Sequence, residues 1–381
     1  MWDIAIIGGG LSGLVLTYRL TQKYGDAWAK EKLRLYEARP RLGGRISGVN
    51  AHSDQDFMLD LGPSWLWPDS QPAINRLLAE LQLTILPQWQ NGHALYQAQR
   101  QVAPQRFIER LAYAGAFRIE GGSSQLIDAL IARCPRECLQ AGLPLTTLSD
   151  ANDHVELQFA STTGAHTETA KSVVLTLPPR LIQHSLQFNP VLAAPLAKAL
   201  ADTPTWMAGH AKIAAVYSEP FWRGQGLSGM ALANFPGAAL AEVFDLCGGH
   251  GQPAVLGGFM ALPYAAREEW RDDLQALVIE QLTRLFGAAA ANPLSLHIQD
   301  WGAEAYTAAP ADWQPPSYHP EYGHPWLAMD HWFDKLFFCG SETAASGGGY
   351  MEGAVVAAER VAREWGIMER DCRQDKGVEA G

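Results

Sequence analysis

The chain has 381 residues, of which 48% are apolar and 18% are charged, and its formal net charge is −11. This length is typical of two domains, and the apolar share is ample for their buried cores. Because the excess charge is negative, nucleic acid and anionic membrane surfaces are not expected as partners.

The sequence shows neither a secretory signal nor a membrane anchor. Met1-Trp2-Asp3 leads directly into an apolar run without a basic segment before it. No apolar run reaches the roughly 18 residues that span a bilayer. An odd count of five cysteines argues against a disulfide framework, and no second pair joins Cys134 and Cys138 at metal-ligand spacing. We therefore expect a cytoplasmic protein without a metal site.

The first 37 residues have the pattern of a nucleotide-binding strand, helix and strand. Ile4 to Ile7 is a short apolar run ending in glycines, which predicts a buried parallel strand. Residues 11–20 are apolar at helical spacing, and residues 33–37 predict a second strand that ends in an acid. This is the context in which a glycine-rich turn binds a dinucleotide.

Each glycine of this turn has a separate physical task. Gly8 permits the tight turn, Gly10 lets the backbone approach a pyrophosphate, and Gly13 lets the helix pack close to the sheet. The helix N-terminus, where Ser12 lies, offers free N–H groups and the positive end of a dipole to the phosphates. Glu37 can accept hydrogen bonds from the ribose hydroxyls of an adenosine.

The remainder of the chain alternates helical and strand patterns. Lys212 interrupts an otherwise apolar strand pattern over residues 206–217, so it lies either on a solvated sheet face or in a functional site. The periodicity predicts helices over residues 71–81 and 125–131 and after Pro190, and strands over residues 143–146, 155–159 and 172–177.

Four segments in a fixed order resemble the flavin-dependent amine oxidases, the family of monoamine, polyamine and L-amino acid oxidases. The resemblance covers roughly residues 3 to 366. The segments are Glu37-Ala-Arg-Pro-Arg-Leu-Gly-Gly-Arg45, Asp60-Leu-Gly-Pro-Ser-Trp-Leu66, Phe117-Arg-Ile-Glu-Gly-Gly-Ser-Ser124 and Cys339-Gly-Ser-Glu-Thr-Ala-Ala-Ser-Gly-Gly-Gly-Tyr-Met-Glu-Gly-Ala354.

The resemblance implies an α/β fold with interleaved segments. A Rossmann-like FAD-binding domain of the glutathione-reductase type would be joined to a second, α+β substrate domain. The expected FAD-binding segments are residues 1–80, 120–190 and 300–368. The substrate domain would comprise 81–119 and 191–299, and 369–381 would form a flexible tail.

The resemblance also implies an activity. The enzyme would oxidise a C–N bond of an amine or amino-acid-like substrate by hydride transfer to flavin N5, and oxygen would reoxidise the flavin with release of hydrogen peroxide. Lys212 would hold a water against N5, and Tyr350 would form one wall of an aromatic cage. The residues implied in FAD binding are Gly8, Gly10, Ser12, Gly13, Glu37, Ala38, Arg39, Gly44, Arg45, Gly62, Pro63, Ser64, Trp65, Leu145, Gly340, Glu342, Gly349, Tyr350 and Met351.

Two departures from the family pattern qualify the substrate. Pro310 stands where monoamine oxidases have the cysteine that bonds to the flavin, and Ala311 replaces the second cage aromatic. We therefore expect non-covalent FAD, and a second wall only if Trp313 or Tyr306 supplies it. Only about 40 residues separate the helix ending near Leu81 from the Gly-Gly-Ser segment, which predicts a shortened lid and room for larger substrates.

Two other functions stay open at this point. A desaturase or porphyrinogen-oxidase-like enzyme would dehydrogenate a bulky substrate on the same fold. A non-catalytic FAD-binding accessory protein would keep the cofactor segments and lose the cage. Lys212 together with Tyr350 favours amine chemistry, whereas the missing second aromatic disfavours it. A small-molecule substrate and molecular oxygen are the expected partners, and the oligomeric state is left open.

Overall fold

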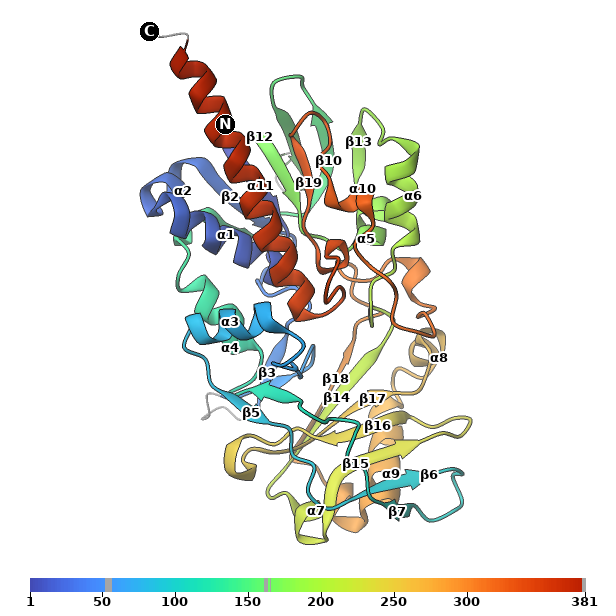
Figure 1. The fold of residues 1–381 in the computed structure, drawn as a ribbon. Coiled ribbons are helices and arrows are strands. Elements are labelled where there is room, and N and C mark those ends of the chain that lie inside the picture. Colours follow the sequence, from blue (N-terminus) through green and yellow to red (C-terminus); the bar gives the residue numbers. More distant parts are fainter. Residues whose placement is uncertain (52–56, 161–163, 165, 379–381) are drawn as a thin grey trace. The chain divides into compact units, whose positions relative to one another are not determined.

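A computed structural model of the chain describes residues 1–51, 57–160, 164 and 166–378. The chain forms two compact units, each assembled from separated segments (Figure 1). The first unit contains Met1–Gly44, Ile127–Trp206 and Tyr318–Gly381, and the second contains Arg45–Leu126 and Met207–Ser317. These bounds differ from the predicted segments: residues 45–80, 120–126 and 300–317 lie in the second unit, and residues 191–206 lie in the first.

The first unit is built on a mostly parallel sheet, in which only β11 pairs antiparallel with its neighbours, and the chain enters it through β1 (Trp2–Ile7). Here β1 lies between β2 (Leu33–Glu37) and β12 (His166–Leu175), with Ile6 opposite both Leu35 and Val174. β1 and β2 are short and largely buried, and β12 is buried over its last four residues, as expected for strands covered on both faces. The other strands of this sheet are β9 (Leu139–Ala141), β10 (Leu145–Asp150), β11 (Val155–Phe159), β13 (Gln187–Asn189) and β19 (Leu336–Phe338).

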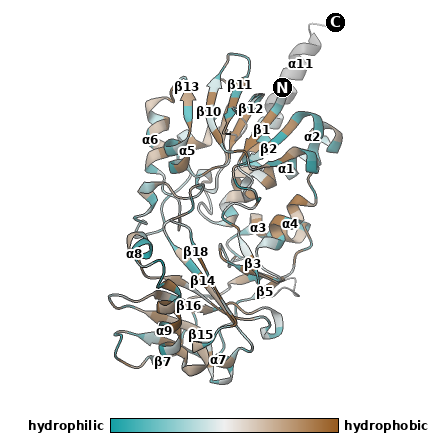
Figure 2. Cartoon of the chain, turned by 180° about the vertical axis from the view of Figure 1, so that it is seen from behind, coloured by the Kyte–Doolittle hydropathy of each residue, from teal (hydrophilic) through white to brown (hydrophobic). Residues whose placement is uncertain are grey.

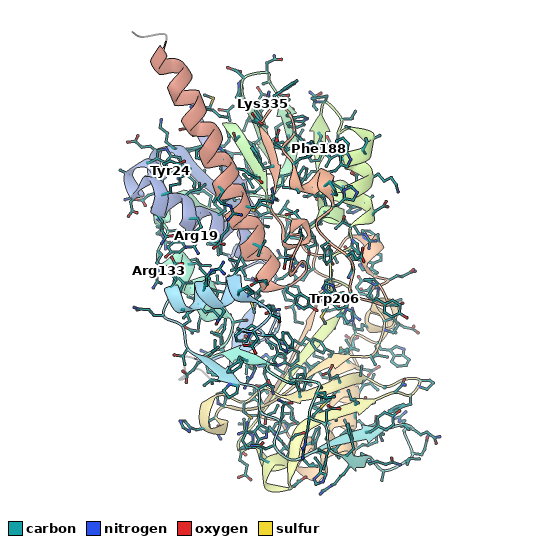
Figure 3. All side chains as sticks on the ribbon, viewed as in Figure 1. Arg19, Tyr24, Arg133, Phe188, Trp206 and Lys335 are labelled. Atoms are coloured by element: carbon teal, nitrogen blue, oxygen red, sulfur yellow. The ribbon has the colours of Figure 1, made fainter. Side chains whose placement is uncertain are left out.

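Two helices from opposite ends of the chain pack together in this unit. Helix α1 (Leu11–Tyr24) lies beside α11 (Met351–Val378). Arg19 and Tyr24, labelled in Figure 3, contribute to this packing: the Arg19 guanidinium lies 3.1 Å from the Glu359 carboxylate, and the ring of Tyr24 meets the edge of Trp365. Helix α11 includes residues 369–378 of the segment that was expected to form a tail.

The remaining helices of the chain are short. Helix α2 (Asp26–Lys32) directly follows α1 and was not predicted from the sequence. The predicted helices appear as α3 (Pro72–Glu80), α4 (Ser124–Ile131) and α6 (Ala194–Asp202). The others are α5 (Pro179–Ser185), α7 (Phe221–Gly224), α8 (Tyr264–Glu269), α9 (Leu274–Phe286) and α10 (Pro325–Ala328).

The second unit is built on a mixed sheet in the order β18-β14-β17-β16-β15-β6-β7. Its neighbours are antiparallel except β15 and β6. The strands are β6 (His93–Gln97), β7 (Gln105–Phe107), β14 (Ala211–Tyr217), β15 (Leu227–Ala233), β16 (Leu240–Asp245), β17 (Ala254–Met260) and β18 (Ser295–Asp300). Two small sheets pair β3 (Gly48–Asn50) with β4 (Met58–Asp60), and β5 (Ile85–Pro87) with β8 (Phe117–Ile119).

The two faces of this sheet have different neighbours. Helix α9 covers one face, where Ile213 and Leu256 pack against Val278, and Figure 2 colours this helix largely as hydrophobic. Ala214 and Phe244 point to the opposite face. Because side chains alternate along a strand, Lys212 lies on the same face as Ala214.

Gly122 illustrates why glycine is required between β8 and α4. Its φ is 97°, and a Cβ at this position would lie 2.2 Å from the carbonyl oxygen of Met58. The same turn presents the backbone N–H of Ser123 to the Asp60 carboxylate at 2.6 Å. A side chain at Gly122 would therefore force apart the loop that fixes Asp60.

We expect Gly122→Ala to lower the free energy of unfolding by about 1–3 kcal/mol, because both the backbone conformation and the space exclude a methyl group. Thermal melting of the purified variant measures this. Gly224→Ala is the matched control, since a Cβ there meets nothing within 4 Å. Equal melting temperatures for the two variants would contradict the assignment.

Candidate functional site

The glycine turn of the first unit has the geometry that its spacing predicts. Gly8 has a φ of 111°, and its N–H donates to the carbonyl of Tyr36 at 2.7 Å. A Cβ on Gly13 would lie 2.0 Å from the Gly8 carbonyl oxygen, so only glycine lets α1 begin this close to β1. A Cβ on Gly10 would meet only Gly44, at 3.9 Å, which leaves the turn open at that point.

Glu37 ends β2 next to this turn and is 4% exposed. One carboxylate oxygen accepts the backbone N–H of Gly9 at 2.7 Å, and the other accepts the N–H of Arg39 at 2.8 Å. An ionised carboxylate offers about four acceptor positions, so these two bonds leave capacity for a further donor. The carbonyl of Glu37 accepts the N–H of Leu143. This bond brings Leu145, at the start of β10, close to the end of β2.

The C-terminal segment meets the glycine turn through Ser12. The Ser12 hydroxyl contacts the carbonyl of Cys339 and lies 2.9 Å from the carbonyl of Ala354. The side chain of Ser12 is thus occupied by the protein itself, and its backbone N–H remains in the first turn of α1, where helical partners are lacking. In the same segment Glu342 is fully buried next to Gly340 and accepts a bond from Ser341.

Tyr350 belongs to an aromatic group of the first unit that also contains Trp206, His319 and Tyr322. The His319 ring is stacked on Tyr350, with centroids 4.8 Å apart and 3° between the planes, and Trp206 (labelled in Figure 3) lies 4.9 Å from His319. A Cβ on Gly349 would collide with the Tyr322 ring at 2.9 Å. Tyr350 itself is 39% exposed, whereas Met351 is buried. The partner His319 carried no signal in the sequence.

Lys212, the lysine predicted to act in the functional site, lies buried in the second unit. It is 2% exposed, and its ammonium donates to the Gly62 carbonyl at 2.7 Å and to the Ser64 hydroxyl at 2.6 Å. The same nitrogen lies 5.6 Å from the ring centre of Phe244 and 5.9 Å from that of Phe259. This burial excludes the alternative of a lysine on a solvated sheet face.

Burial lowers the pKa of Lys212 to about 8, and the nearby charge of Asp60 partly opposes this shift. Burial raises the pKa of Asp60, although Lys212 and two bonds from Ser123 favour its ionised form. The two groups therefore stabilise each other's charge in a buried site. Lys212 can change its protonation state near neutral pH, which an exposed lysine cannot do.

The segment that carries Gly62 to Trp65 is fixed on several sides. A Cβ on Gly62 would lie 2.0 Å from the Arg45 carbonyl oxygen, and Pro63 supplies no N–H. The Trp65 indole donates to Gln88 at 2.8 Å, and its ring packs on Tyr113 at 5.0 Å. These contacts set the position of the two groups that hold Lys212.

The two candidates for a second aromatic wall also lie in the second unit. Trp313 stacks on Tyr264 at 4.7 Å, and its indole donates to the Gly302 carbonyl at 2.9 Å. Trp313 is 40% exposed and Tyr306 is 42% exposed. Trp313 is therefore held in place by its own unit.

The residues of the first unit fit a dinucleotide. Such a ligand requires three parts. They are the open position at Gly10, the 14-residue helix that begins next to it and the buried carboxylate of Glu37. Fold and site thus define a dinucleotide-binding protein with a second, mixed-sheet unit.

Comparison with known families agrees with this class. A family model described as flavin containing amine oxidoreductase matches residues 95–364, and one described as an NAD(P)-binding Rossmann-like domain matches residues 6–81. The chain therefore belongs to the flavin-containing amine oxidoreductases, which confirms the resemblance inferred from its four segments.

Individual relatives are moderately similar. The chain is 28% identical over 249 residues to flavin-containing amine oxidase B of Canis lupus familiaris, covering 64% of this chain and 46% of that protein. It is 30% identical over 255 residues to the putative flavin-containing monoamine oxidase AofH of Mycobacterium tuberculosis, covering 65% and 52%. The chain spans about half the length of the curated relatives it matches.

Solved structures share the fold. A putrescine oxidase bound to putrescine superposes with a TM-score of 0.75 at 19% identity, over 95% of this chain and 98% of that chain. Cyclohexylamine oxidase from Brevibacterium oxydans IH-35A gives a TM-score of 0.76 at 18% identity over the same shares. These matches confirm the α/β fold class.

Two further searches concern only the described part of the chain. Within it, no three His, Cys, Asp or Glu side chains are grouped so that they could hold a metal ion. None of the helices described combines the length and apolar character needed to cross a bilayer.

We expect Glu37→Ala to weaken FAD binding by about 1.5–3 kcal/mol, roughly ten- to a hundredfold, through loss of charge-assisted hydrogen bonds. Fluorescence titration of the apoprotein with FAD measures this. Glu31→Ala removes the same charge from an exposed position and should leave the affinity unchanged. Equal dissociation constants for the two variants would show that Glu37 does not bind the cofactor.

Proposed function

We propose that this protein is an FAD-dependent amine oxidase. The observation that carries the proposal is Lys212, a buried ammonium fixed by Gly62 and Ser64 and placed beside Phe244 and Phe259, in a chain of the flavin-containing amine oxidoreductase family. Burying a cation costs free energy, and buried ionisable groups with shifted pKa values are concentrated at functional sites.

The residues of the first unit would hold the adenosine diphosphate half of FAD. Gly8, Gly10 and Gly13 would admit the pyrophosphate at the N-terminus of α1, and Glu37 would accept the ribose hydroxyls. Leu145 would flank the adenine. The further residues proposed to line the cofactor are Ser12, Ala38, Arg39, Gly44, Arg45, Gly62, Pro63, Ser64, Trp65, Gly340, Glu342, Gly349, Tyr350 and Met351.

Bound FAD supplies the redox chemistry, taking a hydride equivalent from the carbon beside the amine and passing the electrons to oxygen to give hydrogen peroxide. Lys212 contributes a fixed charge and a mobile proton at Nζ. With a pKa of about 8, its ammonium is mostly protonated at pH 7 and can release a proton at modest cost. Gly62 and Ser64 set the direction in which that proton points.

Tyr350 would guide the amine. Its exposed ring offers a negative face to a cationic or dipolar group, and the stacked His319 holds the ring plane. A neutral amine, the form with a free lone pair, would be positioned against this wall before it is oxidised.

The alternative of a bulky, non-amine substrate has one observation in its favour. Ala311 is small and exposed where monoamine oxidases carry an aromatic residue. A desaturase-like oxidation, or a non-catalytic FAD-binding role, would need no second wall. A panel of amines and amino acids, assayed for peroxide and for anaerobic flavin bleaching, distinguishes these functions.

We also infer a cytoplasmic location. The support is that Cys134, Cys138, Cys247 and Cys339 are all free and buried, as is usual where disulfides do not persist.

Lys212→Met should fold and bind FAD, because methionine has a similar stem, but reoxidation of its reduced flavin by oxygen should slow about tenfold or more. Each 1.36 kcal/mol of lost transition-state stabilisation corresponds to a factor of ten. Stopped-flow mixing of the anaerobically reduced variant with oxygen measures the rate. Lys198→Met, at an exposed position, is the control. Reoxidation at the wild-type rate would remove Lys212 from the mechanism.

The flavin should leave the protein on denaturation, because Pro310 cannot form a thioether bond to it. After acid precipitation we expect the yellow colour in the supernatant, where its absorbance equals one FAD per chain. A washed, denatured pellet that stays yellow would disprove non-covalent binding.

A further inference from the structure

Arg118 is a second buried cation of the second unit, and it has no ion pair among the described residues. Its side chain is 6% exposed. One terminal nitrogen donates to the carbonyl of Cys247, and its Nε has no partner. Guanidinium groups stay protonated in proteins. A positive charge is therefore enclosed here without a counterion of its own, which costs free energy.

The carboxylate that acts most strongly on Arg118 is already occupied. Asp245 raises the pKa of Arg118 against the effect of burial. Its two oxygens, however, accept bonds of 2.8 to 3.0 Å from Trp222, Arg223 and the backbone of Cys247. These bonds use the roughly four acceptor positions of a carboxylate. Arg118 is thus left to share the second carboxylate that acts on it, which is Asp60.

Asp60 interacts with both buried cations, because Lys212 and Arg118 each lower its pKa against the effect of burial. Ser123 donates its N–H and its hydroxyl to Oδ1 of Asp60 at 2.6 and 2.7 Å. Strand β8 carries Arg118 and leads directly into the turn that presents Ser123. The residues that follow Asp60 hold the Lys212 ammonium. Two short segments therefore fix the positions of all three charges.

The other strands next to Lys212 bring no further charge to its ammonium. β17 and β18 place Phe259 and Gln299 opposite Lys212, and neither side chain titrates. On β16, the carboxylate of Glu242 accepts a hydrogen bond from a tyrosine. Within the described part of the chain, the charges that act on the pKa of Lys212 are therefore one anion and one cation.

We propose that Arg118 is a positioning residue of the active site, which acts on Lys212 by its own charge and by sharing Asp60, and so keeps the lysine proton easy to release. This inference rests on the proposed function. Asp60 raises the pKa of Lys212 and Arg118 lowers it. Burial and these two opposing charges together hold that pKa at about 8.

A purely structural role for Arg118 makes a different prediction. If Arg118 served only to bond the Cys247 carbonyl, Arg118→Gln would keep a donor there and the titration of Lys212 would not move. If its charge acts on Lys212, the same substitution removes a like charge and raises the pKa of Lys212. Arg118→Lys keeps the charge and should leave that pKa near the wild-type value.

The test follows the Lys212 proton by NMR in the FAD-loaded protein with isotopically labelled lysine. The signal of Lys212 is assigned by its absence from Lys212→Met and is then titrated with pH. We expect wild type to titrate near pH 8. The pKa should be about 1 higher in Arg118→Gln and about 1 lower in Asp60→Asn, each a tenfold change in proton affinity. Arg110→Gln, the same change at an exposed position, should match wild type.

The rate of flavin reoxidation is the second measurement. We expect it to fall as pH rises through the pKa of Lys212, because the ammonium form is lost. The pH of half-maximal rate should therefore be highest in Arg118→Gln and lowest in Asp60→Asn.

Other outcomes separate this inference from the proposed function. An unchanged Lys212 titration in Arg118→Gln, or an equal shift in Arg118→Lys, overturns the inference alone. Titrations that move in the expected order while reoxidation does not follow them confirm the coupling and overturn the proposed role of Lys212. If Arg118→Gln does not fold, Arg118→Met takes its place with the same expectation. A wild-type Lys212 that titrates at the ordinary value of about 10.4 overturns the inference without any variant.

Discussion

The burial of one ammonium group governs the arrangement of the second unit. Removing Lys212 from water is costly, and the unit offsets this with the Gly62 carbonyl, the Ser64 hydroxyl, the nearby Asp60 and two aromatic rings. Each of these partners is itself constrained. Gly62 has no room for a side chain, and the turn at Gly122 presents two donors to Asp60. A substitution at any of these positions would therefore alter the environment of the Lys212 ammonium.

The strand pairing of the sheet fixes the surroundings of Lys212. Its register places Lys212 opposite Phe259, and α9 covers the opposite face, so the strands cannot shift by one residue without exposing the core.

Local patterns predicted the parts of the structure that depend on near neighbours in sequence. The glycine turn, α1 and β2 were predicted correctly because the glycines, the helical spacing and the acid at the strand end lie within one local segment, although α2 between them was missed. The strand around Lys212 followed from its apolar period, and the family from four ordered segments. His319 against Tyr350 and Tyr113 against Glu242 were missed, since the second pair joins residues 129 positions apart and leaves no periodic signal. The unit boundaries also differ, because long-range contacts set them.

The contact of Ser12 with Cys339 and Ala354 has a consequence for biosynthesis. It joins the first helix to residues more than three hundred positions later, and β12 likewise waits for β19. The nascent chain therefore leaves the ribosome with its glycine turn made early but unsupported until the last tenth of the sequence emerges. Such distant pairing slows folding and exposes apolar strands meanwhile. A premature stop codon near the end would abolish cofactor binding although every residue of the N-terminal fingerprint had been translated.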